Sequence, residues 1–131
     1  MTQDMKTYIG TRIIQAKRSP DGLHGYDVEY SDGYKSWSPA KAFEKVYRRT
    51  DAMTFGDALV MLKAEKRVAR AGWNGKAMWL SLVRRSDWDT CQFDPAELLP
   101  FIAMKTADNK FVPWLASQTD MLAEDWCVVE G

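Results

Sequence analysis

Basic side chains and indole rings alternate through residues 61–85, a pattern that suits recognition of a small phosphorylated ligand. This stretch holds seven Lys or Arg residues against a single acid. Guanidinium and ammonium groups attract phosphates, and an indole face stacks on a nucleobase. An asparagine amide both donates and accepts hydrogen bonds at a purine edge. We therefore expect Arg70 and Lys76 to contact phosphates, Trp73 to stack on a base and Asn74 to hydrogen-bond to the ligand.

A second group of polar side chains follows a tryptophan at residues 113–120. Trp114 is followed after two residues by Ser117, Gln118, Thr119 and Asp120. One interpretation is helix capping by Ser117 or Thr119. The other is a polar rim beside a stacking ring, with the amides of a helix N-terminus facing a phosphate. In that case Trp114 is a second base-stacking or pocket-wall ring, and the four polar side chains bind ribose hydroxyls or base edges.

Structural roles also account for part of the basic stretch. Alternation along a strand predicts that Trp79 lies in the core with Val68 and Leu80. Cations at the end of a helix favour the negative end of its dipole and need no ligand. Three residues are interpreted in this way: Lys63, Lys66 and Arg67.

Residues typical of catalytic sites are scarce. The single histidine, His24, lies in a predicted loop at Gly22–Gly25, with no nucleophile beside it in the sequence. A loop histidine of this kind is typical of a solvated residue rather than a general base. The nucleophile-elbow, phosphate-loop, zinc-protease and dinucleotide-binding motifs do not occur. The sequence therefore predicts no catalytic residue.

Metal and cofactor sites are not indicated either. Cys91 and Cys127 lack the spacing of metal ligands and are too few for a disulfide framework. The closest acidic pairs are typical of solvated loops: Asp87 with Asp89, and Glu124 with Asp125. We expect neither a metal nor a cofactor.

The composition is that of a globular protein without a polyanionic partner. The 131 residues are 46% apolar and 27% charged, and 18 basic residues balance 18 acidic ones. A protein that grips a nucleic-acid polymer usually has a basic excess, so we expect no such partner. No apolar run approaches the roughly 20 residues of a membrane span, and residues 1–10 lack an apolar signal core. These features predict a cytoplasmic protein that does not bind membranes.

Residues 1–52 are interpreted as a β-rich N-terminal module that ends in a helix. Strands are expected at 8–16 and 26–30, and a hairpin turn is expected at Ser31-Asp32-Gly33. Ser38 and Pro39 predict the N-cap and the first position of a helix over 39–48. The sequence assigns no role to this module.

Residues 53–131 are interpreted as a second, ligand-binding domain. Thr54 and Asp57 predict a capping box at the start of a helix, whose buried stripe comprises Phe55, Ala58, Leu59 and Leu62. Strands are expected at 67–71, 77–83, 101–107, 110–112 and 126–129, with turns at 72–75 and 108–109 and a short helix at 117–123. The pattern lacks β-α-β alternation. It therefore predicts an α+β fold with a small antiparallel sheet and short helices.

Long segments of the second domain carry a family resemblance. They read MTFGDAL at 53–59, RVARAGWNGKAMWL at 67–80 and LPFIAMKTADNKFVPWLASQTDMLAEDW at 99–126. These segments resemble the second type of the phage Thoeris anti-defence family, and the resemblance covers residues 53–129. Ala77 and Asn109 stand where that family is expected to have glycine, and Cys127 replaces a polar residue. Residues 84–97 do not follow the family's pattern. Residues 1–50 look like an N-terminal extension seen on some phage proteins.

The resemblance implies a binding protein and not an enzyme. Members of this family act as sponges that capture cyclic ADP-ribose isomers made by bacterial TIR-domain enzymes. Some members are also thought to hold cyclic di- or trinucleotides of a second defence pathway, CBASS. The family is known for homotetramers with ligand pockets between protomers. By this resemblance we expect a homo-oligomeric sponge for a small cyclic nucleotide in the host bacterial cytoplasm.

Two other classes of function stay open. The first alternative is a protein–protein adaptor or inhibitor that uses a Trp-rich surface as its hot spot. The second is a nucleotide hydrolase, although the sequence supplies neither a base nor a metal for it. The fate of the nucleotide distinguishes the three: a sponge returns it intact, a hydrolase cleaves it and an adaptor never removes it from solution.

Overall fold

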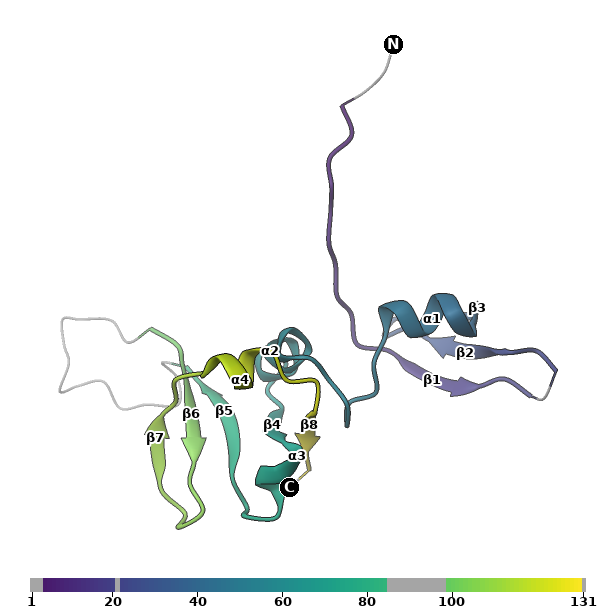
Figure 1. The fold of residues 1–131 in the computed structure, drawn as a ribbon. Coiled ribbons are helices and arrows are strands. Elements are labelled where there is room, and N and C mark those ends of the chain that lie inside the picture. The colour runs from purple at the N-terminus through teal and green to yellow at the C-terminus, as the bar shows by residue number, and fades with distance from the viewer. Residues whose placement is uncertain (1–3, 21, 85–98, 131) are drawn as a thin grey trace. The chain divides into compact units, whose positions relative to one another are not determined.

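Antiparallel sheets form the framework of the chain, as the strand-rich sequence predicts (Figure 1). The computed structural model describes residues 4–20, 22–84 and 99–130. The chain divides into two units, Met1–Tyr47 and Arg48–Gly131, each with a sheet of its own. Together with the short helices, these sheets confirm the predicted α+β fold class.

The first unit is a three-stranded antiparallel sheet followed by one helix. Its elements are β1 (Gln15–Arg18), β2 (Gly25–Glu29), β3 (Lys35–Pro39) and α1 (Ala40–Val46), and the sheet order is β1-β2-β3. Gly33 has a φ of 89°, and its N–H donates to the carbonyl of Tyr30 at 2.9 Å, which confirms the predicted hairpin turn. Tyr26 of β2 stacks on Phe43 of α1 with ring centroids 4.1 Å apart. The helix therefore covers one face of the sheet.

The strand expected at residues 8–16 is shorter than predicted. It begins only at Gln15, which pairs with Glu29, the last residue of β2. Because the chain turns away directly after Glu29, β2 offers no residue opposite the earlier positions. The side chains of Tyr8 and Ile9 are consequently 87% and 97% exposed.

The helix predicted over residues 39–48 starts one residue late, and its predicted N-cap is wrong. Ser38 and Pro39 pair with Tyr26 and Gly25 and so complete β3. The strand ladder holds Ser38 in place, and no side chain caps α1. The helix begins at Ala40 instead.

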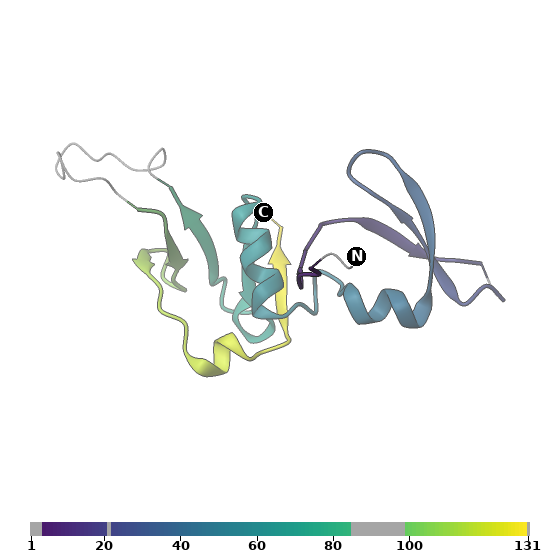
Figure 2. The same cartoon turned by 90° about the horizontal axis from the view of Figure 1, so that it is seen from above.

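The second unit is a five-stranded antiparallel sheet of order β7-β6-β5-β4-β8. Its elements are α2 (Phe55–Lys63), β4 (Arg67–Arg70), α3 (Ala71–Asn74), β5 (Trp79–Val83), β6 (Phe101–Lys105), β7 (Phe111–Pro113), α4 (Gln118–Met121) and β8 (Trp126–Val129). Helix α2 packs against β4, β5 and β8 (Figure 2). None of the helices in the described ranges is long and apolar enough to cross a membrane.

Helix α2 starts at the predicted capping box. The hydroxyl of Thr54 accepts a hydrogen bond from the N–H of Asp57, and the Asp57 carboxylate accepts one from the N–H of Thr54. Arg48 donates two further hydrogen bonds to this carboxylate. The bond to Arg48 is the largest cause of the lowered pKa of Asp57, which burial opposes. The start of α2 is therefore fixed by its own capping box and by Arg48, which lies nine positions before Asp57.

The core of the second unit lies between α2 and the sheet. Of the predicted stripe, Ala58 and Leu62 are buried, and Phe55 and Leu59 pack against the core while partly exposed. The other buried members of this cluster are Met53, Met61, Val68, Leu80 and Trp126. The predicted core positions of Val68 and Leu80 are thus confirmed, whereas the sequence interpretation missed Met61.

The predicted turn at residues 72–75 is a single helical turn, α3. Gly75 has an ordinary φ of −66°, and the positive φ of this connection, 57°, falls on Ala77. In the predicted turn between β6 and β7, Asn109 has a φ of 67°. Both residues stand where the resembled family is expected to have glycine, and both occupy the left-handed region that favours glycine.

Replacing Ala77 with glycine should raise the free energy of unfolding by about 1 kcal/mol, because a Cβ is strained in the left-handed region. Asn109→Gly should give a smaller gain, since asparagine tolerates this region. Urea denaturation of the full chain measures both effects. Ala71→Gly in helical α3 is the matched control and should lower the free energy of unfolding. A gain at Ala71 as large as that at Ala77 would show that backbone strain is not the cause.

Candidate functional site

Four aromatic rings meet at one end of the core of the second unit. Trp126 is fully buried at the centre, with its ring centroid 5.4 Å from Trp73, 6.0 Å from Trp114 and 5.4 Å from Phe55. Trp73 and Trp114 meet edge to face at 6.1 Å. Both are partly exposed. The structure therefore brings together the two indoles that the sequence analysis places in the candidate site.

Backbone hydrogen bonds position these two rings. Trp73 lies in α3, which follows β4 directly and is held by the N–H of Ala71 donating to the carbonyl of Asp125 at 3.2 Å. Trp114 follows β7 and donates its N–H to the carbonyl of Ile102 on the neighbouring strand at 2.9 Å. Each ring thus extends from the end of a strand and packs against the buried Trp126.

Arg70 lies beside this cluster and faces two carboxylates. Its Nε donates to Asp125 Oδ1 at 2.7 Å, and its Nη1 donates to Asp120 Oδ1 at 3.0 Å. The hydrogen bond that Arg70 donates to Asp125 is the largest cause of the raised pKa of its guanidinium. Arg70 and Asp120 are brought together with Trp73, as the predicted site requires, but the guanidinium is occupied within the protein. Asp125, which the sequence analysis interpreted as a solvated loop residue, is its partner.

The turn that carries the polar group starts at a second capping box. The Ser117 hydroxyl accepts from the N–H of Asp120 at 3.1 Å, and the Asp120 carboxylate accepts from the N–H of Ser117 at 3.1 Å. Burial raises the pKa of Asp120, but the hydrogen bonds from Ser117 and Arg70 outweigh it and the pKa is lowered. The capping interpretation is therefore confirmed for Ser117. Helix α4 is one turn long, so its terminus provides no separate phosphate site.

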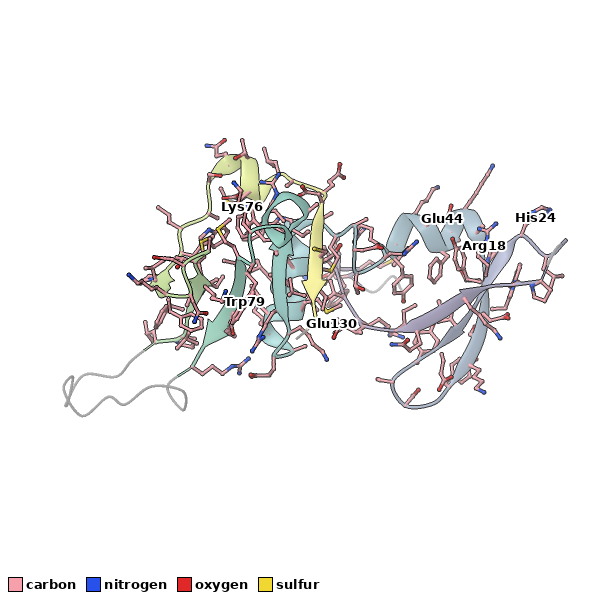
Figure 3. All side chains as sticks on the ribbon, turned by 90° about the horizontal axis from the view of Figure 1, so that it is seen from below. Arg18, His24, Glu44, Lys76, Trp79 and Glu130 are labelled. Carbon is pink, nitrogen blue, oxygen red and sulfur yellow. The ribbon has the colours of Figure 1, made fainter. Side chains whose placement is uncertain are left out.

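The remaining candidates lie on two turns: α3 with its connection to β5, and α4 with its N-cap. Gln118 and Thr119 are exposed residues of α4, and the Thr119 hydroxyl lies 2.8 Å from that of Ser117. Lys76 is exposed in the connection between α3 and β5 (Figure 3). Asn74 is the last residue of α3, and its side chain lies outside the described part of the structure.

Trp79 does not share the core with its neighbour Leu80, contrary to one sequence interpretation. Leu80 pairs with Val68 inside the core, so Trp79 lies on the other face of the sheet. There Arg67 stacks over the indole at 4.2 Å, and Phe111 meets it edge to face at 5.7 Å. Arg67 is the first residue of β4 and does not end a helix, whereas Lys63 does lie in the last turn of α2.

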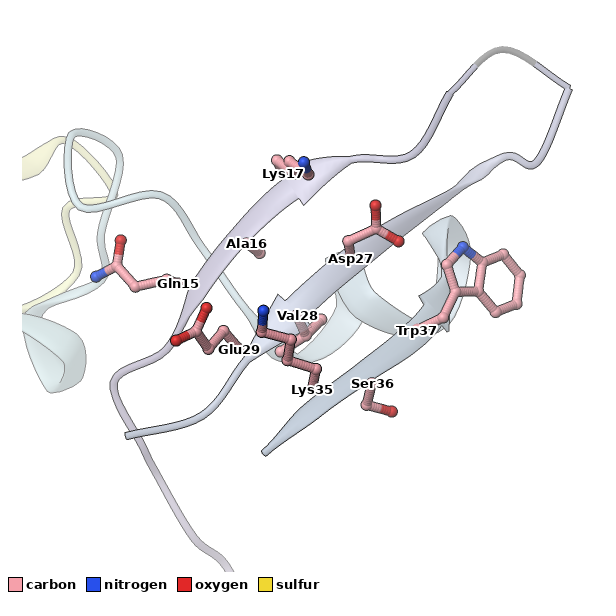
Figure 4. A pocket seen from close by; sticks show the side chains of 9 residues that line it. All are labelled: Gln15, Ala16, Lys17, Asp27, Val28, Glu29, Lys35, Ser36 and Trp37. Atoms are coloured by element: carbon pink, nitrogen blue, oxygen red, sulfur yellow. The ribbon is translucent and has the colours of Figure 1, made fainter. Parts of the chain in front are cut away.

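Two hollows lie on sheet faces, and none of the four rings of the aromatic cluster lines either of them. One, of about 480 Å³, is bordered by Trp79 and Phe111 in the second unit. The other, of about 690 Å³, lies on the first unit and is lined by charged side chains and by Trp37 (Figure 4). Trp37 donates its Nε1–H to the Ser19 hydroxyl at 2.8 Å. None of the nine candidate residues lines either hollow, and two residues that do, Arg67 and Trp79, had been given structural roles.

The residues considered for catalysis and metal binding are dispersed. His24 is an exposed residue of the β1–β2 connection, as predicted, and it has a φ of 48°. Within residues 4–20, 22–84 and 99–130, no three His, Cys, Asp or Glu side chains gather in a way that could hold a metal ion. Cys91, Asp87 and Asp89, on which the sequence also gave predictions, lie outside the described residues. So does most of the segment 84–97, which differs from the resembled family.

The second unit is a small α+β domain, in which an antiparallel sheet packs against α2 and an aromatic cluster lies at one end of the core. Residues 53–129 match the family model of the Thoeris anti-defense 2-like domain, and the chain belongs to this phage anti-defence family. It is similar to a protein of Bacillus phage SP01 named "Thoeris anti-defense 2". The two are 45% identical over 85 residues, which span 59% of this chain and 94% of the relative.

All nine candidate residues fall inside the matched segment, whereas residues 1–52 lie outside it. The match with the phage SP01 protein covers 94% of that relative but 59% of this chain. The candidate site thus belongs to the part of the chain that the family shares.

Acid should destabilise the second unit through Asp57 and Asp120. Because the pKa of each carboxyl is lowered by folding, each contributes stability above its unfolded pKa of about 3.9, and this stability is lost as pH falls through the folded pKa. Asp120→Asn should therefore flatten the dependence of the free energy of unfolding on pH below about pH 5. Urea denaturation at a series of pH values measures this. Equal flattening in the control Asp51→Asn would contradict the assignment.

Proposed function

We propose that the chain sequesters a small cyclic nucleotide immune signal and holds it without cleaving it. The observation that carries the proposal is the convergence of Trp73, Trp114 and the α4 turn within the segment that matches a phage anti-defence family. Indole rings suit nucleobases, and exposed hydroxyl and amide groups suit ribose hydroxyls and base edges. Such a protein would act in the cytoplasm of the host cell, where the signal is made.

The proposed roles divide between the two turns. On α3 and its connection to β5, Trp73 provides a stacking ring, Asn74 hydrogen-bonds to a base edge and Lys76 contacts a phosphate. On and before α4, Trp114 is a second base-stacking or pocket-wall ring. The polar groups proposed to contact ribose or base edges there are Ser117, Gln118, Thr119 and Asp120. Asp120 has the least capacity left for this role, since its carboxylate already accepts hydrogen bonds from Ser117 and Arg70.

The proposed ligand is a cyclic ADP-ribose isomer, with cyclic di- or trinucleotides as further ligands. A dissociation constant near 10 nM corresponds to about −11 kcal/mol, so several enclosed contacts must act together. Trp73 and Trp114 are only partly buried, and a second copy of the chain would enclose a ligand against them. We therefore propose a homo-oligomer, a tetramer by family resemblance, with pockets between protomers.

The alternative, an adaptor or inhibitor that acts by protein contact, is favoured by the sheet face that carries Trp79, opposite the core. Phe111 on that face is 63% exposed and meets Trp79 edge to face. Exposed aromatic side chains are typical of protein–protein hot spots. This function requires no nucleotide, so one experiment separates it from sequestration.

Purified full-length protein should remove glycocyclic ADP-ribose from solution and release it intact when heated. Incubation followed by filtration measures the loss, and mass spectrometry of the heated sample identifies the released compound. A cleaved product would indicate a hydrolase. No uptake of glycocyclic ADP-ribose or of any cyclic di- or trinucleotide would overturn sequestration and favour the adaptor.

Trp114→Ala should weaken binding of glycocyclic ADP-ribose by about 5- to 150-fold, since one stacked base contributes roughly 1–3 kcal/mol. Isothermal titration measures the dissociation constant. Trp37→Ala in the first unit is the matched control, because it removes a partly exposed indole outside the family segment. Thermal unfolding of both variants checks that the fold is retained. Equal loss of affinity in Trp37→Ala would show that the effect is not specific to the proposed site.

A further inference from the structure

We infer that Arg70 is a positioning residue, which fixes the two turns of the candidate site relative to one another and does not itself contact a ligand phosphate. This inference rests on the proposed function and assigns Arg70 a role different from the one that its charge alone suggests. It is carried by the partners of the guanidinium, which come from two other segments of the second unit.

Arg70 lies where the first of these turns begins. It is the last residue of β4 and the residue immediately before α3, which carries Trp73. Its backbone is in register with Trp126 of β8. The direction of the Arg70 side chain is therefore set by the sheet, and its guanidinium has a defined place beside the start of α3.

The second turn is held through Asp120. One oxygen of this carboxylate accepts from Arg70 at 3.0 Å, and the other accepts from the N–H and the hydroxyl of Ser117 at 3.1 and 2.8 Å. The carbonyl of Asp120 accepts from the indole Nε1–H of Trp126 at 2.9 Å. Because Ser117 is the N-cap of α4, the Arg70 contact fixes the start of the turn that presents Thr119.

The third segment is the residue before β8. Asp125 accepts from Arg70 Nε at 2.7 Å, while its carbonyl accepts from the N–H of Ala71, the first residue of α3. The guanidinium and the backbone of α3 thus bind the same residue. A planar guanidinium can direct separate N–H groups to two carboxylates, which a lysine ammonium does not reproduce with the same geometry.

Charge balance argues against phosphate contact by Arg70. One guanidinium faces two carboxylates, so the three groups together carry a net charge of minus one. Only 25% of the Arg70 side chain is exposed, against 15% for Asp120 and 43% for Asp125. A phosphate approaching Arg70 would meet two negative groups at short range. Lys76, exposed beyond α3, is the better candidate for the phosphate.

The two roles of Arg70 predict opposite effects of Asp125→Asn. If Arg70 positions the turns, removing this carboxylate charge loosens them, and affinity for glycocyclic ADP-ribose should fall by at least threefold. If Arg70 binds a phosphate, the same change frees the guanidinium and removes a repulsive charge, so affinity should rise. Asp125 is partly exposed, so this variant is expected to fold. Isothermal titration of the full chain, with Asp51→Asn as the matched control, gives the answer.

Salt dependence provides a second test with other variants. Arg70→Gln and Arg70→Lys should weaken binding at every salt concentration, with the wild-type slope of affinity against salt. Lys76→Gln should reduce that slope, because it removes an ion contact to the ligand. A reduced slope in Arg70→Gln, or tighter binding in Asp125→Asn, would overturn the positioning role while leaving sequestration intact.

A ligand-free measurement separates this inference from the proposed function. The near-UV circular dichroism of the packed indoles should weaken in Arg70→Lys and Asp125→Asn, while the far-UV spectrum is retained. Wild-type protein that binds no nucleotide would overturn sequestration, and the near-UV spectra would still decide whether Arg70 orders the two turns. Unchanged near-UV spectra in both variants would overturn the inference.

Discussion

Burial of the Trp126 indole is the constraint on which the second unit depends. The side chain is fully buried, and its ring contacts Phe55, Trp73 and Trp114. Its Nε1–H donates to the carbonyl of Asp120, so its polar atom is satisfied within the apolar cluster. A single side chain thereby connects α2, α3, the segment after β7 and α4. The aromatic cluster is consequently both the end of the core and the wall of the candidate site.

The candidate site depends on tertiary contacts because its two turns cannot hold themselves. Helices α3 and α4 have four residues each, and isolated helices shorter than about 12–15 residues are marginal in water. Asp125 holds α3 through its carbonyl, and Trp126 holds α4 through its indole N–H. The side chains proposed to contact a ligand are therefore held in place by positioning residues that do not contact it. Arg70 is such a positioning residue, although its charge suggests contact with a phosphate.

The sequence predicted those features whose causes are local. The capping box of Thr54 and Asp57 spans three residues, and Gly33 permits its turn. Capping by Ser117 is equally local, and the sequence had offered it with Thr119 as the alternative cap. The features it missed depend on distant partners. Arg70 and Asp125 are separated by 55 positions, so spacing alone gave no sign of their pairing. The early start predicted for β1 failed for a similar reason, because strand composition does not reveal where the partner strand ends.

The two units have different packing, and the residues of the proposed binding site belong to the second unit. Within the described part of the first unit, Val28 is the buried hydrophobic residue, and Tyr26 of the sheet stacks on Phe43 of α1. A Cβ on Gly25 would lie 2.4 Å from the Trp37 ring, so this ring packs directly on strand backbone. None of these contacts involves a candidate residue, and the family match begins only at position 53. The candidate residues therefore assign no function to the first unit, whereas the proposed capture of a nucleotide depends on the packing around Trp126.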